Sequence, residues 1–181
     1  MSSIQRPSAS QLIELLQLQP LPVEGGLFRQ SWRSSLKVDV HGCQHPAGTA
    51  IYGLLTDEPD SFSALHRLRS DEVWHFYLGD PVGMLLLHPG GRIERVVLGA
   101  DLFGGQVLQQ VVPAGCWMGA KLLAGGRYGL FGCTSAPGFI EADYEGGDAR
   151  LASQYPQAAS EIAALLREGA MLSMPAAPER G

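Results

Sequence analysis

Residues 63–79 contain the side-chain types that acid–base chemistry requires. His66 carries an imidazole, which exchanges protons near neutral pH, and Glu72 places a carboxylate six residues further along the chain. The alternation of apolar and polar residues around them predicts two strands joined by a bend. If these strands curl into a small barrel, both side chains converge on its interior. We therefore predict that His66 and Glu72 are the catalytic residues of a site inside a barrel.

Other side chains are expected to line the same cavity. Trp74 and Phe76 alternate in phase with Glu72, so they would fill the barrel and form part of the pocket wall. His75 is out of phase with them and is predicted to face the outer side of the sheet. The predicted ligand-binding residues are Gln109, Met118, Trp74, Phe76, Trp117 and Tyr128.

A purely structural interpretation stays open beside the functional one. His66 and Glu72 would then form a hydrogen-bonded pair that stabilises the core, and the aromatic residues would be ordinary core residues. For His75 we expect a dimer contact or a backbone hydrogen bond. Asp143 and Glu145 are expected to form a solvated or helix-capping patch rather than a catalytic pair.

The remaining sequence predicts the elements that must position the site. Short apolar runs recur between turns rich in glycine and proline, which is typical of an all-β sandwich or barrel. A helix capped by Ser8 or Ser10 is expected before the strands, and a last helix is expected to begin near Pro156. Residues 34–48 are expected to form a loop or an irregular hairpin. The strands are predicted at residues 27–33, 49–55, 61–68, 72–78, 83–88, 93–98, 106–112, 116–122 and 128–134.

Length and composition indicate one globular domain. The chain has 181 residues, of which 45% are hydrophobic and 17% are charged, so it can bury a sizeable core and is not a disordered chain. We assign residues 11–168 to a single domain, residues 1–10 to an N-terminal arm and residues 169–181 to a C-terminal tail. The net charge of −5 and the lack of a basic cluster argue against nucleic acid as a partner.

The N-terminal residues and the cysteines bear on the cellular compartment. The chain does not begin with an apolar stretch of the signal-peptide type, and no apolar run approaches the length of a membrane span. We therefore expect a cytoplasmic protein without membrane contact. Cys43, Cys116 and Cys133 show no Cys-x-x-Cys spacing, so we expect reduced thiols rather than disulfides or a zinc site.

Two short motifs resemble those of the cupin superfamily. Residues 66–79, His-x-Leu-x3-Glu-x6-Gly, resemble the first cupin motif with Leu68 in place of its second histidine. Residues 113–118, Pro-x-Gly-x2-Met, resemble the second motif with Met118 in place of its histidine. The resemblance implies a double-stranded β-helix, the jelly-roll barrel of cupins, with short helices near both ends.

Four longer blocks are similar to a small family of uncharacterised bacterial and fungal cupins, formerly a domain of unknown function. They are Glu-Gly-Gly at 24–26, Ser-Asp-Glu-x-Trp-His-Phe at 70–76, the block 109–117, and the block 133–139 with its Pro-Gly-Phe. The chain departs from the family at Gly53, where a bulky aromatic residue is usual, at Gln30, and at Pro22-Val23. Membership implies the cupin fold and no settled activity.

The same resemblance implies that the protein is often a dimer. The open sheet edges of a small barrel also invite pairing with another chain. We therefore expect a homodimer, with the predicted strand at residues 27–33 as a candidate for crossing to the partner.

The motifs also bear on metal binding. Cupin metals are usually held by three imidazoles and a carboxylate, but here Leu68 cannot coordinate a metal and Met118 offers only a soft thioether. We therefore expect no cofactor and no tightly bound metal. If a divalent metal binds, its expected ligands are His66, Glu72 and Gln109, completed by water.

A more distant similarity is to the metal-free sugar-nucleotide 3,5-epimerases. His66 and Gln109 match positions of those enzymes, but Glu72 stands where they carry a lysine that would favour a developing enolate. The similarity implies a small polar ligand and acid–base chemistry in general, but not the 3,5-epimerase reaction itself. Our leading hypothesis is a sugar-like or carboxylated ligand and isomerase, epimerase or lyase chemistry through His66 and Glu72. The alternatives are a metal-dependent cupin oxygenase or isomerase with a reduced ligand set, and a non-catalytic binding or structural cupin.

Overall fold

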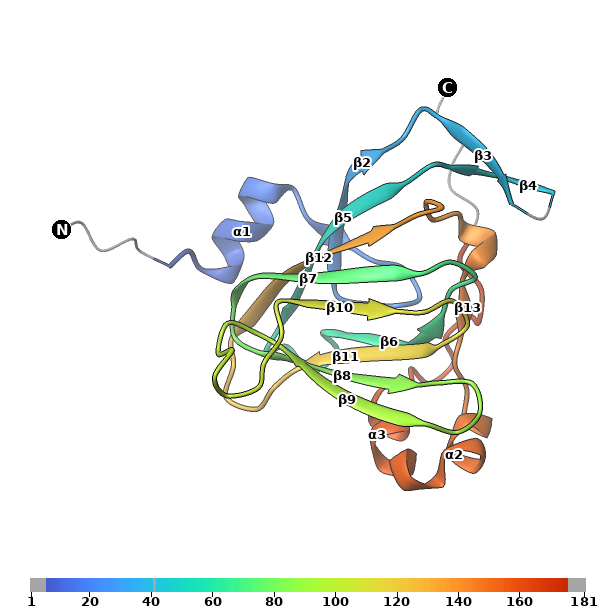
Figure 1. The fold of residues 1–181 in the computed structure, drawn as a ribbon. Coiled ribbons are helices and arrows are strands. Elements are labelled where there is room, and N and C mark those ends of the chain that lie inside the picture. The colour runs from blue at the N-terminus through green and yellow to red at the C-terminus, as the bar shows by residue number, and fades with distance from the viewer. Residues whose placement is uncertain (1–5, 41, 176–181) are drawn as a thin grey trace.

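The computed structural model describes residues 6–40 and 42–175, and the chain within them folds into two packed antiparallel sheets (Figure 1). The outermost parts of the predicted N-terminal arm and C-terminal tail lie outside the described residues. In spatial order, the six-stranded sheet contains β1 (Gln19–Pro20), β2 (Leu27–Arg33), β5 (Thr49–Thr56), β12 (Tyr128–Ser135), β7 (Glu72–Gly79) and β10 (Gln109–Val112). The five-stranded sheet contains β13 (Glu145–Gly146), β6 (Phe62–Arg67), β11 (Trp117–Leu122), β8 (Val82–Leu87) and β9 (Ile93–Leu98).

The architecture confirms the all-β prediction of a double-stranded β-helix with short flanking helices. The segment expected as a loop or irregular hairpin forms the hairpin of β3 (Lys37–Val40) and β4 (Cys43–Pro46), which pair only with each other. Strand β2, the candidate for crossing to a partner, pairs with β5 of its own chain.

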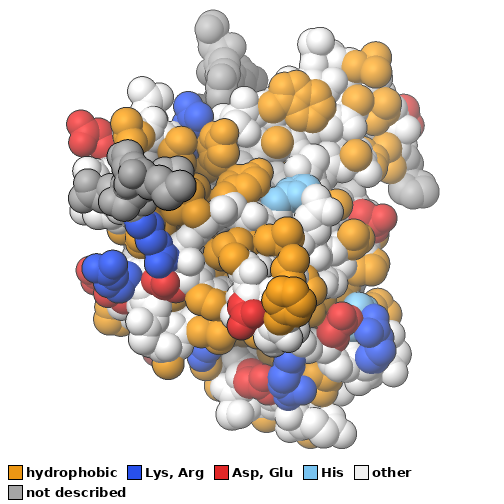
Figure 2. All heavy atoms as spheres, turned by 60° about the vertical axis from the view of Figure 1, so that its left-hand side comes forward, with side chains coloured by type: hydrophobic (Ala, Val, Ile, Leu, Met, Phe, Trp, Pro, Cys, Tyr) orange, Lys and Arg blue, Asp and Glu red, His pale blue; other side chains and the backbone are white. Residues whose placement is uncertain are grey.

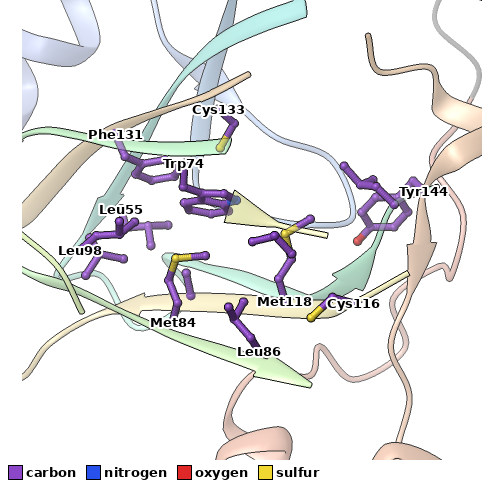
Figure 3. Packing of buried hydrophobic residues seen from close by; sticks show 14 residues of the cluster. Leu55, Trp74, Met84, Leu86, Leu98, Cys116, Met118, Phe131, Cys133 and Tyr144 are labelled. Atoms are coloured by element: carbon purple, nitrogen blue, oxygen red, sulfur yellow. The ribbon is translucent and has the colours of Figure 1, made fainter. Parts of the chain in front are cut away.

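The main core lies between the two sheets. Trp74 and Phe131 stack with ring centroids 4.5 Å apart, and side chains of β8 and β11 approach them from the opposite sheet, including Met84 and Met118 (Figure 3). Alternate residues of a strand point to opposite faces, so Met84 and Leu86 enter this core while Leu85 and Leu87 point away from it.

Helices pack on the outer faces of both sheets. Helix α1 (Ala9–Leu16) begins at Ser8, whose side chain accepts a hydrogen bond from the backbone N–H of Gln11, and it packs on the outer face of the six-stranded sheet. Helices α2 (Arg150–Gln154) and α3 (Ala159–Ala164), joined by the 3-10 turn η2 (Pro156–Ala158), cover the outer face of the five-stranded sheet. Helix α2 was not predicted from the sequence, whereas the last helix begins close to Pro156 as predicted, because η2 starts at Pro156 and runs directly into α3 at Ala159.

The acidic segment is not the solvated patch that we expected. Its 3-10 turn η1 (Glu141–Asp143) buries Asp143, whose carboxylate lies 2.9 Å from Nε2 of the equally buried His45. Glu145 is exposed and paired with Arg67. Among the described residues, no helix is long and apolar enough to cross a bilayer.

Candidate functional site

His66 lies on β6 with only 2% of its surface exposed. Its Nδ1 lies 2.8 Å from the carbonyl oxygen of Ala64. Because a carbonyl can only accept, Nδ1 must carry a hydrogen, and Nε2 of the neutral ring is an acceptor. The ring stacks on Tyr144 with centroids 5.1 Å apart, which fixes its orientation. His66 therefore presents Nε2 in one defined direction.

Glu72 is the first residue of β7 and lies in the interior with 8% of its surface exposed. One carboxylate oxygen accepts a hydrogen bond of 2.8 Å from the indole Nε1 of Trp74. Burial raises the pKa of Glu72 to about 7, with His66 opposing this increase and the Glu24 carboxylate adding to it. Glu72 can therefore donate or accept a proton at neutral pH.

Glu24 lies at this candidate site, although it was not predicted from the sequence. It lies on the loop of residues 21–26 between β1 and β2, and one carboxylate oxygen is 3.7 Å from Nε2 of His66. The other oxygen accepts a 2.7 Å hydrogen bond from the hydroxyl of Ser63. The Glu-Gly-Gly block was visible in the sequence, but we interpreted it only as a turn and as a family signature.

A cavity of about 30 Å³ lies beside these groups, with room for about two water molecules. Glu24, Ser63 and Glu72 supply the polar part of its wall. His66 lies next to the cavity, in contact with Glu24, rather than on the wall itself. The apolar part of the wall includes Trp74, Phe131 and Cys133.

Three of the predicted ligand-binding residues lie elsewhere, and we correct their assignment. Gln109 is exposed on the outer face of its sheet, where its amide nitrogen lies 2.9 Å from Nδ1 of His75. Trp117 packs under α2 and α3, with the Arg67 guanidinium 4.6 Å from its ring centroid. Tyr128 packs against α1, and its hydroxyl donates to the carbonyl oxygen of Pro7 at 2.6 Å.

The reason for these corrections is the phase of each strand. Gln109 pairs directly with His75, so it shares the outward face that we predicted for His75. Trp117 and Tyr128 likewise occupy the outward phase of β11 and β12. A shift of one residue moves a side chain to the other face, and a single sequence does not reveal that register.

The other predicted residues do face the interior, in different places. Trp74 lies on the cavity wall, whereas Met118 is fully buried in the core and Phe76 packs against the same core. Cys133, on β12, is a wall residue that we had not predicted. Burial raises the pKa of its thiol well above the usual value, so the thiol stays protonated at neutral pH.

The residues present do not fit the metal centre of cupins. Leu68 and Met118, at the two histidine positions, are buried core residues. Nδ1 of His66 is bound to a carbonyl oxygen, and within residues 6–40 and 42–175 no three His, Cys, Asp or Glu side chains are grouped to hold a metal ion.

Comparisons with solved structures place this geometry in a family. The chain is similar to a hypothetical protein from Leishmania major, with 35% identity, a TM-score of 0.82, and coverage of 90% of this chain and 100% of that one. It is also similar to a protein from Shewanella oneidensis, with 34% identity, a TM-score of 0.79, and coverage of 90% and 99%. A dTDP sugar isomerase from Desulfovibrio desulfuricans shares the fold alone, with 14% identity, a TM-score of 0.51, and coverage of 80% and 93%.

The family model gives the same result over most of the domain. No curated protein matches the chain significantly. The model described as Cupin superfamily (DUF985) matches residues 10–146, which include the Glu24 loop and both strands of the His66–Glu72 pair. The chain therefore belongs to the DUF985 family of the cupin superfamily.

Proposed function

We propose that this cupin binds a small, uncharged, hydroxylated molecule at the Glu24–His66–Glu72 site and moves a proton on it, as isomerases, epimerases and lyases do. The observation that supports this proposal is a buried Glu72 with a pKa of about 7 beside a second carboxylate that faces an imidazole. General acid–base catalysis is most effective when the pKa of the catalytic group lies near the working pH. No metal is required for this chemistry.

The two carboxyl groups would have different roles. Glu72, protonated for part of the time at neutral pH, is the acid. Glu24 and His66 together form the base when the imidazole is neutral, because Nε2 of His66 and a Glu24 oxygen are then two acceptors 3.7 Å apart. A water between these atoms would donate one hydrogen to each acceptor, whereas a ligand hydroxyl would donate to one of them. A proton taken from the ligand by Glu24 could then pass to His66.

The charge of the wall favours a sugar-like ligand over a carboxylated one. No lysine or arginine is among the residues that line the cavity, and two of them are glutamates. A carboxylated ligand would meet an unpaired carboxylate in a buried site, which is unfavourable. A neutral polyol would instead donate hydroxyls to Glu24 and Glu72 and place its C–H face against Trp74.

A non-catalytic role is the second candidate, because the cavity is small. A volume of about 30 Å³ holds water but no sugar, so a catalytic ligand requires part of the wall to move outward, and the loop of residues 21–26 is our candidate for that part. If the loop stays closed, the polar residues only bind water and stabilise the core.

Solvent deuterium exchange tests the proposal on many candidate ligands at once. The protein is incubated in D2O with a panel of neutral aldoses, ketoses and lactones, and proton NMR follows loss of the C–H signal next to the carbonyl group. We expect exchange with at least one compound, reduced about a hundredfold or more by Glu72→Gln or His66→Gln. His75→Gln, which alters a histidine on the outer face, is the control. Absence of exchange and of binding across the panel would favour the non-catalytic role.

A further inference from the structure

Arg167 follows α3 and reaches back to the loop that carries Glu24. Its Nε donates to the carbonyl oxygen of Glu24 at 3.1 Å, and Nη2 donates to the carbonyl oxygens of Asp60 at 2.5 Å and Phe62 at 3.0 Å. The guanidinium also lies 4.1 Å from the ring centroid of Phe62. One cation therefore joins the loop of residues 21–26 to the start of β6.

The loop leaves space for this guanidinium at Gly25. A Cβ atom added to Gly25 would overlap Nη2 of Arg167 and would lie 2.7 Å from the carbonyl oxygen of Phe62. Gly25 also has a φ of +97°, which other residues rarely adopt. The loop and the arginine are therefore complementary in shape as well as in hydrogen bonding.

The loop needs such an attachment, because its backbone is strained. Val23 has a φ of +66°, an unfavourable value for a β-branched residue. One backbone bond, from Ala64 N–H to the carbonyl oxygen of Glu24 at 2.9 Å, joins the loop to the middle of β6. The same carbonyl oxygen accepts from Arg167, and the Glu24 carboxylate accepts from Ser63, so three attachments meet at Glu24.

We infer that Arg167 is a positioning residue that holds the loop of residues 21–26 closed and thereby places the Glu24 carboxylate against His66. Its release lets the loop swing outward, which opens the cavity and removes Glu24 from the imidazole. The role in catalysis rests on the proposed function, but the attachment itself can be tested without any ligand.

The reactivity of the Cys133 thiol indicates whether the loop is closed. Its thiol lies on the cavity wall that Glu24, Gly25 and Gly26 close, and it is 5% exposed. Cys116 is also buried, with 1% of its surface exposed, but it bonds to the carbonyl oxygen of Leu87 and is not on the cavity wall. Opening of the loop exposes only Cys133, whereas global unfolding exposes both thiols.

The experiment measures the rates at which methyl methanethiosulfonate modifies Cys133 and Cys116, by mass spectrometry of peptides. Cys43, which is exposed, is replaced by serine throughout. Arg167→Gln removes charge-assisted bonds to three carbonyl oxygens, and the loss of one such bond favours opening about tenfold or more. We therefore expect Cys133 to react at least about tenfold faster in this variant, with the Cys116 rate unchanged.

A second variant disrupts the contact between Arg167 and the loop by changing a loop residue. Gly25→Ala displaces the guanidinium, so it should accelerate Cys133 modification in the same selective way. Arg95→Gln is the matched control, because Arg95 attaches α3 to the body of the protein through Glu161 without touching the loop. Arg167→Lys keeps the positive charge but loses the planar donor fork and the stacking on Phe62, so its Cys133 rate should lie between those of the parent and of Arg167→Gln.

Three results would overturn the inference. The first is an unchanged Cys133 rate in Arg167→Gln. The second is equal acceleration of Cys133 and Cys116, which indicates general destabilisation. The third is the same effect in Arg95→Gln. None of these measurements depends on a substrate, so failure of the proposed function would leave their outcome intact.

Discussion

At the scale of single residues, Glu72→Gln should separate stability from function. The pKa of Glu72 is about 7 in the folded protein, against 4.5 for an unperturbed glutamate, so folding keeps a proton that the unfolded chain has lost. The free energy of unfolding should therefore fall as the pH rises from about 4.5 through 7. Above pH 7 it should be lower than at pH 4 by about 3 kcal/mol. The amide of glutamine has no such penalty, and its oxygen can still accept from Trp74.

The measurement is urea unfolding of both proteins at pH 4, 6 and 8. We expect equal stability near pH 4 and a more stable Glu72→Gln variant at pH 8, by up to about 3 kcal/mol. Any ligand found in the deuterium-exchange panel should bind this variant more weakly. A variant that is less stable at pH 8 and keeps full ligand affinity would mark Glu72 as a structural residue.

Strand phase explains which site residues could be predicted from the sequence. Alternation along one strand suffices to place Glu72 and Trp74 inside and His75 outside. The direction of the Gln109 side chain could not be predicted in this way, because it follows from the register between β10 and β7, which is set by tertiary pairing. Glu24 lies on a loop, where no periodicity indicates the direction of a side chain, so only the structure could bring it to His66.

At the scale of elements, the pairing of β5 with β12 makes a prediction at Gly53. Gly53 lies directly opposite Phe131, and an added Cβ would overlap two atoms of the phenyl ring. The ring cannot move away freely, because it stacks on Trp74. Gly53→Ala should therefore lower the free energy of unfolding by about 1–3 kcal/mol.

A double-mutant cycle in urea checks that mechanism. If the clash with the ring is the cause, Gly53→Ala should lower the free energy of unfolding by clearly less in a Phe131→Leu background, because leucine is smaller and more adaptable. An equal decrease in both backgrounds would show that the effect arises in the β5 backbone instead.

The strands were predictable because each combines an apolar run with flanking turn residues. Helix α2 could not be predicted, because it has only five residues and no side-chain hydrogen bond at its N-cap. It is held instead by the packing of Leu151 against the outer face of β6 and β8. Tertiary packing of this kind leaves no periodic signal in so short a segment.

At the scale of the whole molecule, the outer face of the six-stranded sheet is only partly covered. Helix α1 packs on one end of it, while Trp32 is 51% exposed, Tyr77 47% and Val111 53%. Figure 2 shows apolar side chains gathered around a histidine on this side of the molecule. We propose that a second copy of the chain covers this face in a homodimer that requires no exchange of β2.

Light scattering at micromolar concentration should then give twice the chain mass. Val111→Lys places a charge on the uncovered face and on the edge strand β10, so it should shift the protein to monomer. Phe103→Ser, at a fully exposed position in the loop before β10, should leave the dimer intact. A parent protein that scatters only as a monomer would refute the proposal.

The contact between Arg167 and Glu24 also has a consequence for the order of folding. The two residues are 143 positions apart in the sequence, and contacts of high sequence separation form late because they close the longest segment of flexible chain. The sheets can pair and bury Trp74 before the C-terminal segment arrives. We therefore expect the loop that carries Glu24 to be fixed late in folding, after the strands that carry His66 and Glu72 have paired.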